Sequence, residues 1–155
     1  MESIKINDGS IRLCINDDES RVISFNPNDV NFAQRFYELL DDFSAKEQVM
    51  LDKAKALDDT LKYDAQGKPI NMGEIFKFTK ELDEYFREQL DYVFGEGTSK
   101  TCFGNINVMS VDNKGNRILN NFLIAIAPYI SNARQGKVNK YTNKYKGKNN
   151  HANRK

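Results

Sequence analysis

Histidine and cysteine are scarce in this chain, and tryptophan is absent. The 155 residues contain one histidine, His151, and two cysteines, Cys14 and Cys102. A single histidine excludes most catalytic triads that depend on this residue, and it excludes metal sites with several histidine ligands. Two isolated cysteines favour reduced, buried thiols over a disulfide or a redox site. The sequence therefore predicts a non-enzymatic protein that holds no metal and no cofactor.

Long apolar runs are missing as well. No stretch reaches the roughly 18 consecutive apolar residues of a membrane span. Residues 1–15 lack the basic flank and the apolar core of a signal peptide. Charged residues make up 29% of the chain and hydrophobic residues 39%, a balance typical of a soluble globular domain. We expect a cytoplasmic protein with no membrane contact and with one folded domain over residues 1–135.

Acidic residues are absent from the last part of the chain. Residues 134–155 carry eight basic and no acidic residues, whereas residues 1–133 carry 15 basic and 22 acidic residues and a net charge of −7. Few core-forming residues occur there, so we expect a flexible basic tail over residues 136–155. Basic residues interleaved with tyrosines are compatible with nucleic-acid binding, with contact to an acidic partner, and with a solubilising tail. The candidate tail contacts are Lys137, Lys140, Lys144, Lys146 and Lys148.

Alternating apolar residues predict β-structure near the N-terminus. The alternation includes Ile4 and Ile6, continues over residues 11–15, and is followed by a third apolar group at residues 22–25. Polar turn residues separate the three segments, and one of these turns contains Asp8-Gly9, a common hairpin signal. We therefore expect a small antiparallel β meander of three strands over about residues 3–25.

Three longer segments have the apolar periodicity of amphipathic helices. They cover about residues 29–62, 72–94 and 117–133. The first follows a near-heptad repeat, which fits one long helix or two helices with a break near Ser44. Its apolar stripe is too long for a small meander to cover, so a coiled coil between copies and an intramolecular bundle are both compatible with it. The predicted fold class is α+β, mainly α: a β meander, then a helical bundle, then the basic tail.

The second helix has clear predicted ends. Asn71 and Glu74 have the spacing of a capping box at its start. Gly95 stands where a left-handed residue would end it. The glycine-rich residues 95–100 do not match a phosphate-binding loop, because a helix precedes them and the glycine spacing differs. We interpret this segment as a structural turn.

The end of this helix and the turn after it carry a family resemblance. Residues 90–98 read LDYVFGEGT, and residues 102–104 read CFG before an apolar helix and a basic tail. This arrangement resembles the small tail assembly chaperones of long-tailed phages and prophages of Gram-positive bacteria. In that family a helix ends in a Phe-Gly-x-Gly-Thr turn, and an apolar-Phe-Gly step follows. The resemblance covers about residues 72–135, and the heptad helix before it has no counterpart in the family.

The resemblance implies a non-enzymatic chaperone in the host cytoplasm. Such proteins bind the long, helical tape measure protein and keep it soluble while tail tube proteins assemble around it. Apolar residues of the second helix and its turn would then contact the partner: Phe78, Leu82, Phe86, Leu90, Phe94, Gly95, Gly97 and Phe103. Homo-oligomers are compatible with this role. The alternative is a small phage or mobile-element inhibitor or adaptor that binds a host defence protein or a nucleoprotein complex.

Overall fold

A short β-hairpin precedes a set of helices. The computed structural model describes residues 1–131, except the side chains of residues 54, 57 and 58. Two strands, β1 (Ile11–Ile15) and β2 (Asp18–Phe25), are followed by α1 (Val30–Asp58), α2 (Gly73–Phe94) and α3 (Thr98–Phe103). A last helix occupies residues 118–131. The predicted fold class, α+β and mainly α, is confirmed, and α3 is an addition that its six residues made too short to detect by periodicity.

The β-structure is a hairpin of two antiparallel strands, so the expected three-stranded meander was wrong in its first strand. Asn16 and Asp17 form the turn with φ of 52° and 61°, the conformation that two-residue hairpin turns require. Ile4 and Ile6 instead lie in a segment without secondary structure, residues 1–10, in which every side chain is exposed. Alternation alone does not make a strand, because a strand needs a neighbour for its backbone hydrogen bonds.

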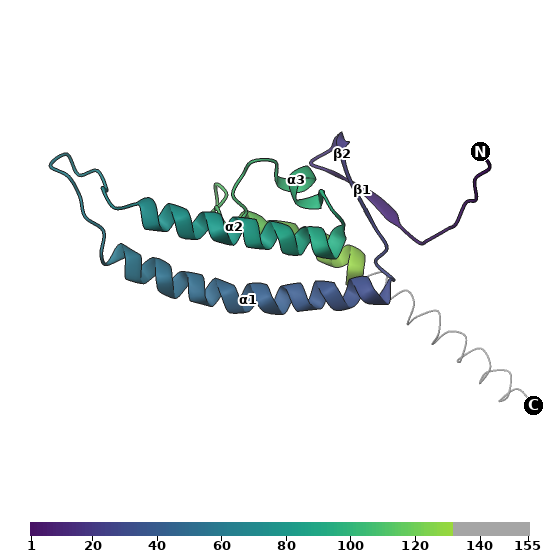
Figure 1. The fold of residues 1–155 in the computed structure, drawn as a ribbon, viewed down its shortest axis with the longest axis horizontal. Coiled ribbons are helices and arrows are strands. Elements are labelled where there is room, and N and C mark those ends of the chain that lie inside the picture. Colours follow the sequence, from purple (N-terminus) through teal and green to yellow (C-terminus); the bar gives the residue numbers. More distant parts are fainter. Residues whose placement is uncertain (132–155) are drawn as a thin grey trace, which may run out of the picture.

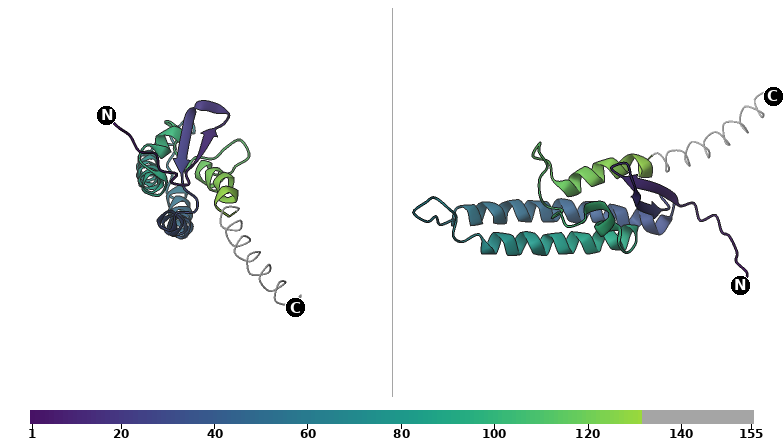
Figure 2. Two further views of the ribbon diagram at one scale, coloured as in Figure 1. Left: turned by 90° about the vertical axis from the view of Figure 1, so that its right-hand side faces the viewer. Right: turned by 90° about the horizontal axis from the view of Figure 1, so that it is seen from above.

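The long helices α1 and α2 lie side by side and antiparallel (Figures 1 and 2). Helix α1 continues through Ser44 without a break. The Phe43 and Phe86 ring centroids are 5.4 Å apart, and the Tyr85 hydroxyl donates a hydrogen bond to the carboxylate of Asp42. That hydrogen bond, together with burial and the charge of Asp42, raises the pKa of Tyr85 to about 12. The near-heptad stripe of α1 thus packs against α2 of the same chain.

Aromatic side chains concentrate at the end of the helix pair that carries the β-hairpin. The Phe25 centroid lies 5.0 Å from that of Phe32 and 5.2 Å from that of Phe94, and the Phe94 and Phe122 centroids are 5.4 Å apart. The hairpin, α3 and the last helix gather on this part of the pair (Figure 2). We call it the hairpin end. The opposite end, formed by the last turns of α1, the loop of residues 59–72 and the first turns of α2, is the distal end.

Two arginines join elements that are far apart in the sequence. The guanidinium of Arg21 on β2 donates to the carbonyl oxygens of Thr101 and Cys102 at 2.9 and 2.7 Å, which holds the hairpin on the end of α3. Arg117, at the start of the last helix, pairs with Glu47 of α1 at 3.2 Å. Hydrogen bonds that involve a charged group contribute more than neutral ones, about 1.5–3 kcal/mol each. These contacts fix the positions of the elements around α2.

Candidate protein-binding surface

The predicted binding face of α2 is mostly interior. Four of the eight predicted residues are buried, with 0–7% of each exposed: Phe86, Leu90, Phe94 and Phe103. Phe78 and Leu82 are half-buried and pack against the same core. In this fold the face does not project into solvent as a ready surface for a partner. An apolar stripe shows that one face of a helix is covered but does not show which element covers it. The role of these residues in binding a partner stays a prediction.

The two predicted glycines form the tight connection between α2 and α3. Gly95 has φ of 115° and Gly97 has φ of 86°, both in the region that favours glycine. The N–H of Gly95 donates to the carbonyl oxygen of Asp91 at 2.9 Å and closes α2. The Asp91 carboxylate accepts the N–H of Ser99 at 2.8 Å, in the first turn of α3. The glycine turn therefore has a clear structural role in reversing the chain.

An ion pair on α2 holds the segment after α3. The Asp83 carboxylate lies 3.1 Å from Nε of Arg87, and it also accepts the N–H of buried Val108 at 2.8 Å. Arg87 donates in turn to the carbonyl oxygen of Ile106 at 2.6 Å. Both charged side chains are only 18% exposed, so this pair contributes more to the stability of the fold than an exposed ion pair would.

Some sequence predictions fall on the undescribed end of the chain. The basic tail with Lys137, Lys140, Lys144, Lys146 and Lys148 lies outside the described residues. Within residues 1–131, no helix combines the length and the apolarity of a membrane span. Over the same range, no three His, Cys, Asp or Glu side chains gather closely enough to hold a metal ion.

The loop at the distal end is held by its own side chains. The Asp64 carboxylate accepts two backbone N–H groups of the following turn, each at 2.9 Å. Asn71 donates to the carbonyl oxygen of Thr60 at 2.8 Å and accepts the N–H of Lys62 at 2.7 Å. The capping-box prediction was therefore wrong: Asn71 joins the two sides of the loop, and Met72 precedes α2 without a side-chain cap. The loop has a defined shape on which exposed side chains can be presented.

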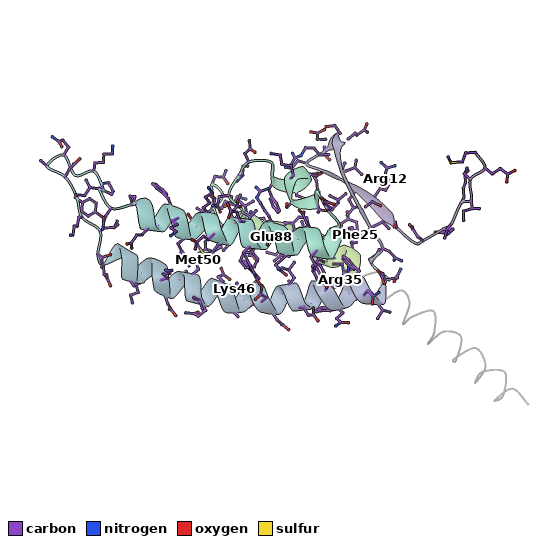
Figure 3. The ribbon with its side chains drawn as sticks, in the orientation of Figure 1. Arg12, Phe25, Arg35, Lys46, Met50 and Glu88 are labelled. Carbon is purple, nitrogen blue, oxygen red and sulfur yellow. The ribbon has the colours of Figure 1, made fainter. Side chains whose placement is uncertain are left out.

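Large apolar side chains are exposed on this loop and on the parts of α1 and α2 that lead to it. Five of them are 48–63% exposed, and we call these five the distal surface: Val49, Leu51, Tyr63, Ile70 and Phe76. Met50 lies between α1 and α2 toward their distal end (Figure 3) and is 7% exposed. Val49 and Leu51 therefore flank the buried seam on either side of α1. Exposed apolar residues that lie together can form a protein-binding surface, so this end of the helix pair is the candidate site.

Sequence reasoning missed the distal surface. The signal was present, because Val49, Leu51 and Phe76 each stand one position from a residue of the apolar stripe. Such positions project about 100° from the stripe and are expected to be polar on a helix that has only one covered face. Apolar residues there are candidates for a second contact surface.

At the distal end, the described part of the chain has only two helices. The hairpin, α3 and the last helix lie along the remainder of the pair (Figures 1 and 2). Two packed helices bury the side chains of one seam and leave those beside the seam accessible. A third helix from a partner can pack there and cover apolar side chains from both helices.

Comparison of the chain with protein-family models, with curated proteins and with solved structures found no match. The fold and the distal surface place the chain in a broad class: α+β proteins with a two-helix extension that exposes apolar side chains at its end.

Proposed function

We propose that this protein is a tail assembly chaperone that binds the tape measure protein of a phage or prophage tail through its distal surface. The observation that carries the proposal is the set of exposed apolar side chains at the distal end of α1 and α2, opposite the hairpin end. A long helical protein presents apolar stripes until its own partners cover them. A stripe of this kind can pack beside the seam of two helices. The resemblance of residues 90–104 to tail assembly chaperones supports the same role.

The proposed contact differs from the one expected from the sequence. Phe86 and Leu90 belong to the core, so substitutions there would lower the stability of the fold and would not remove a direct contact with the partner. Phe78 is half-buried, and the ammonium group of Lys53 lies 4.2 Å from the centroid of its ring. A partner helix that displaces the Lys53 side chain would reach Phe78 and extend the contact from Phe76 along α2.

Affinity purification of the tagged protein from phage-infected or induced cells tests the proposal. The bound proteins are identified by mass spectrometry, with and without nuclease. The key variant is Phe76→Glu, and its matched control is Ile124→Glu on the last helix, because both wild-type side chains are 63% exposed. We expect Phe76→Glu to reduce recovery of the tape measure protein at least about tenfold, the effect of removing one buried aromatic contact. Ile124→Glu keeps full recovery.

The other outcomes separate the two functional hypotheses. Equal recovery with Phe76→Glu, or equal loss with both variants, contradicts a contact at the distal surface. Recovery of a host defence protein or a nucleoprotein complex, with no tape measure protein, supports the inhibitor or adaptor. Circular dichroism of each purified variant confirms that its helices are intact.

A further inference from the structure

Residues 1–10 form an arm that leaves the body before β1 (Figure 1). Ile4 and Ile6 of the arm are 85% and 76% exposed. In an extended segment, alternate side chains lie on the same side, so Glu2, Ile4 and Ile6 share one side and polar residues occupy the other. The arm therefore has the pattern of a half-buried strand but no covering surface within residues 1–131.

Hydrogen bonds fix the direction of the arm at its base, residues 8–10. Nδ2 of Asn26 donates to the carbonyl oxygen of Asp8 at 2.7 Å, and the Asp8 carboxylate accepts the N–H of Ser10 at 2.9 Å. Gly9 has φ of 76°, and a Cβ at this position would lie 3.0 Å from the Asn26 side chain. These contacts direct residues 1–6 away from the body, as the ribbon shows in three views (Figures 1 and 2).

A groove of about 540 Å³ lies between the β-hairpin and the last helix. Its walls include Leu13 and Ile15 of β1 and Ile118 and Phe122 of the helix, and Arg21 is the one charged residue among the described residues that line it. The sheet of residues 1–131 has two strands, so β1 has one edge without a neighbouring strand. An apolar groove lined by strands and a helix, in a sheet with an unpaired edge, can take up an extended peptide.

The arm and the groove match in length and in chemistry. The extended chain from Glu2 to Ile6 spans about 13 Å. The last helix rises about 16 Å between residues 118 and 129, both of which line the groove. With Ile4 and Ile6 against the apolar walls, Glu2 on the same side of the arm carries the charge that complements Arg21.

We propose that this groove binds the N-terminal arm of a second copy of the chain, so that two copies associate by exchanging arms. Such an exchange is symmetric, because each copy donates one arm and receives one. The contact lies at the hairpin end and leaves the distal surface open. The inference is therefore independent of the proposed function, and the purified protein alone tests it.

Sedimentation of the full chain over a range of concentrations tests the arm. The wild type forms a concentration-dependent dimer. Ile4→Glu and Ile6→Glu each weaken this dimer at least about tenfold, because each removes one buried aliphatic side chain. Val30→Glu, at an exposed site at the start of α1, leaves the dimer unchanged. A wild type that stays monomeric, or an arm variant that dimerises like the wild type, overturns the proposal.

A variant pair on the last helix tests the groove. Ala125 is exposed and lines the groove, whereas the neighbouring Ile124 is exposed and does not line it. Ala125→Arg abolishes the dimer, and Ile124→Glu retains it. Both variants keep the wild-type unfolding midpoint, because both sites are exposed. Retention of the dimer by Ala125→Arg assigns the contact to another surface and overturns the proposal.

Mixing the variants tests the exchange itself. An arm variant retains an intact groove, and Ala125→Arg retains an intact arm, so the mixture restores one of the two contacts and dimerises more tightly than either protein alone. Cys14 lines the groove and is exposed, so its reaction with a maleimide is slower in the wild-type dimer than in the arm variant. Slow reaction in a wild type that is monomeric shows that the arm covers its own groove, which contradicts exchange between copies.

Discussion

Substitution of two phenylalanines on the same helix has very unequal predicted effects on stability. Phe86 is 0% exposed and Phe76 is 63% exposed. Phe86→Ala removes ring contacts to Phe43 and Tyr85, with centroids at 5.4 and 5.2 Å, and each such contact contributes roughly 0.5–1.5 kcal/mol. With the lost burial and the cavity, the free energy of unfolding falls by about 3–5 kcal/mol. Phe76→Ala changes it by no more than about 0.5 kcal/mol.

Urea unfolding followed by far-UV circular dichroism measures both effects. With a slope of about 1–3 kcal/mol per molar urea, Phe86→Ala lowers the midpoint by roughly 2 M and leaves the slope unchanged. Phe76→Ala keeps the wild-type midpoint and serves as the control. Equal midpoints for the two variants would refute the placement of Phe86 in the core. Equal midpoints would also support this face of α2 as a partner-binding surface.

Three further measurements test individual contacts. Asp83→Ala leaves the N–H of buried Val108 without its acceptor and lowers the free energy of unfolding by about 1–3 kcal/mol in the same urea assay, and Asp83→Asn, which keeps an acceptor oxygen, loses less. In the arm variant Ile4→Glu, a thiol reagent at neutral pH modifies exposed Cys14 quickly and Cys102 only on unfolding, because Cys102 is buried and burial raises its pKa to about 11; fast reaction of both thiols contradicts the packing. The hydrogen bond that raises the pKa of Tyr85 from 10.0 to about 12 contributes stability that is complete below pH 10 and is lost as the pH rises toward about 12. Unfolding midpoints measured across that range decline, and Tyr85→Phe removes this part of the decline.

The candidate site was only partly predictable from the sequence. Phe78 and Leu82 were predicted at a binding face and are half-buried, whereas none of the five residues of the distal surface was predicted. The exposure of Phe76 depends on what lies beside the distal end of α2, and nothing in the local sequence specifies that. The groove depends equally on two segments, β1 and the last helix, that are about a hundred residues apart in the sequence.

The sequence by itself determined the local elements. The apolar period of α1, α2 and the last helix, and the positive φ of the glycines at 95 and 97, follow from side-chain spacing and backbone freedom within a few residues. Only the tertiary structure decided which faces are covered. Ile4 and Ile6 have a strand pattern but no neighbour, and the aromatic face of α2 is interior because α1 and the last helix cover it. The physical reason is that burial and strand pairing are properties of two segments together, whereas a periodic pattern describes only one of them.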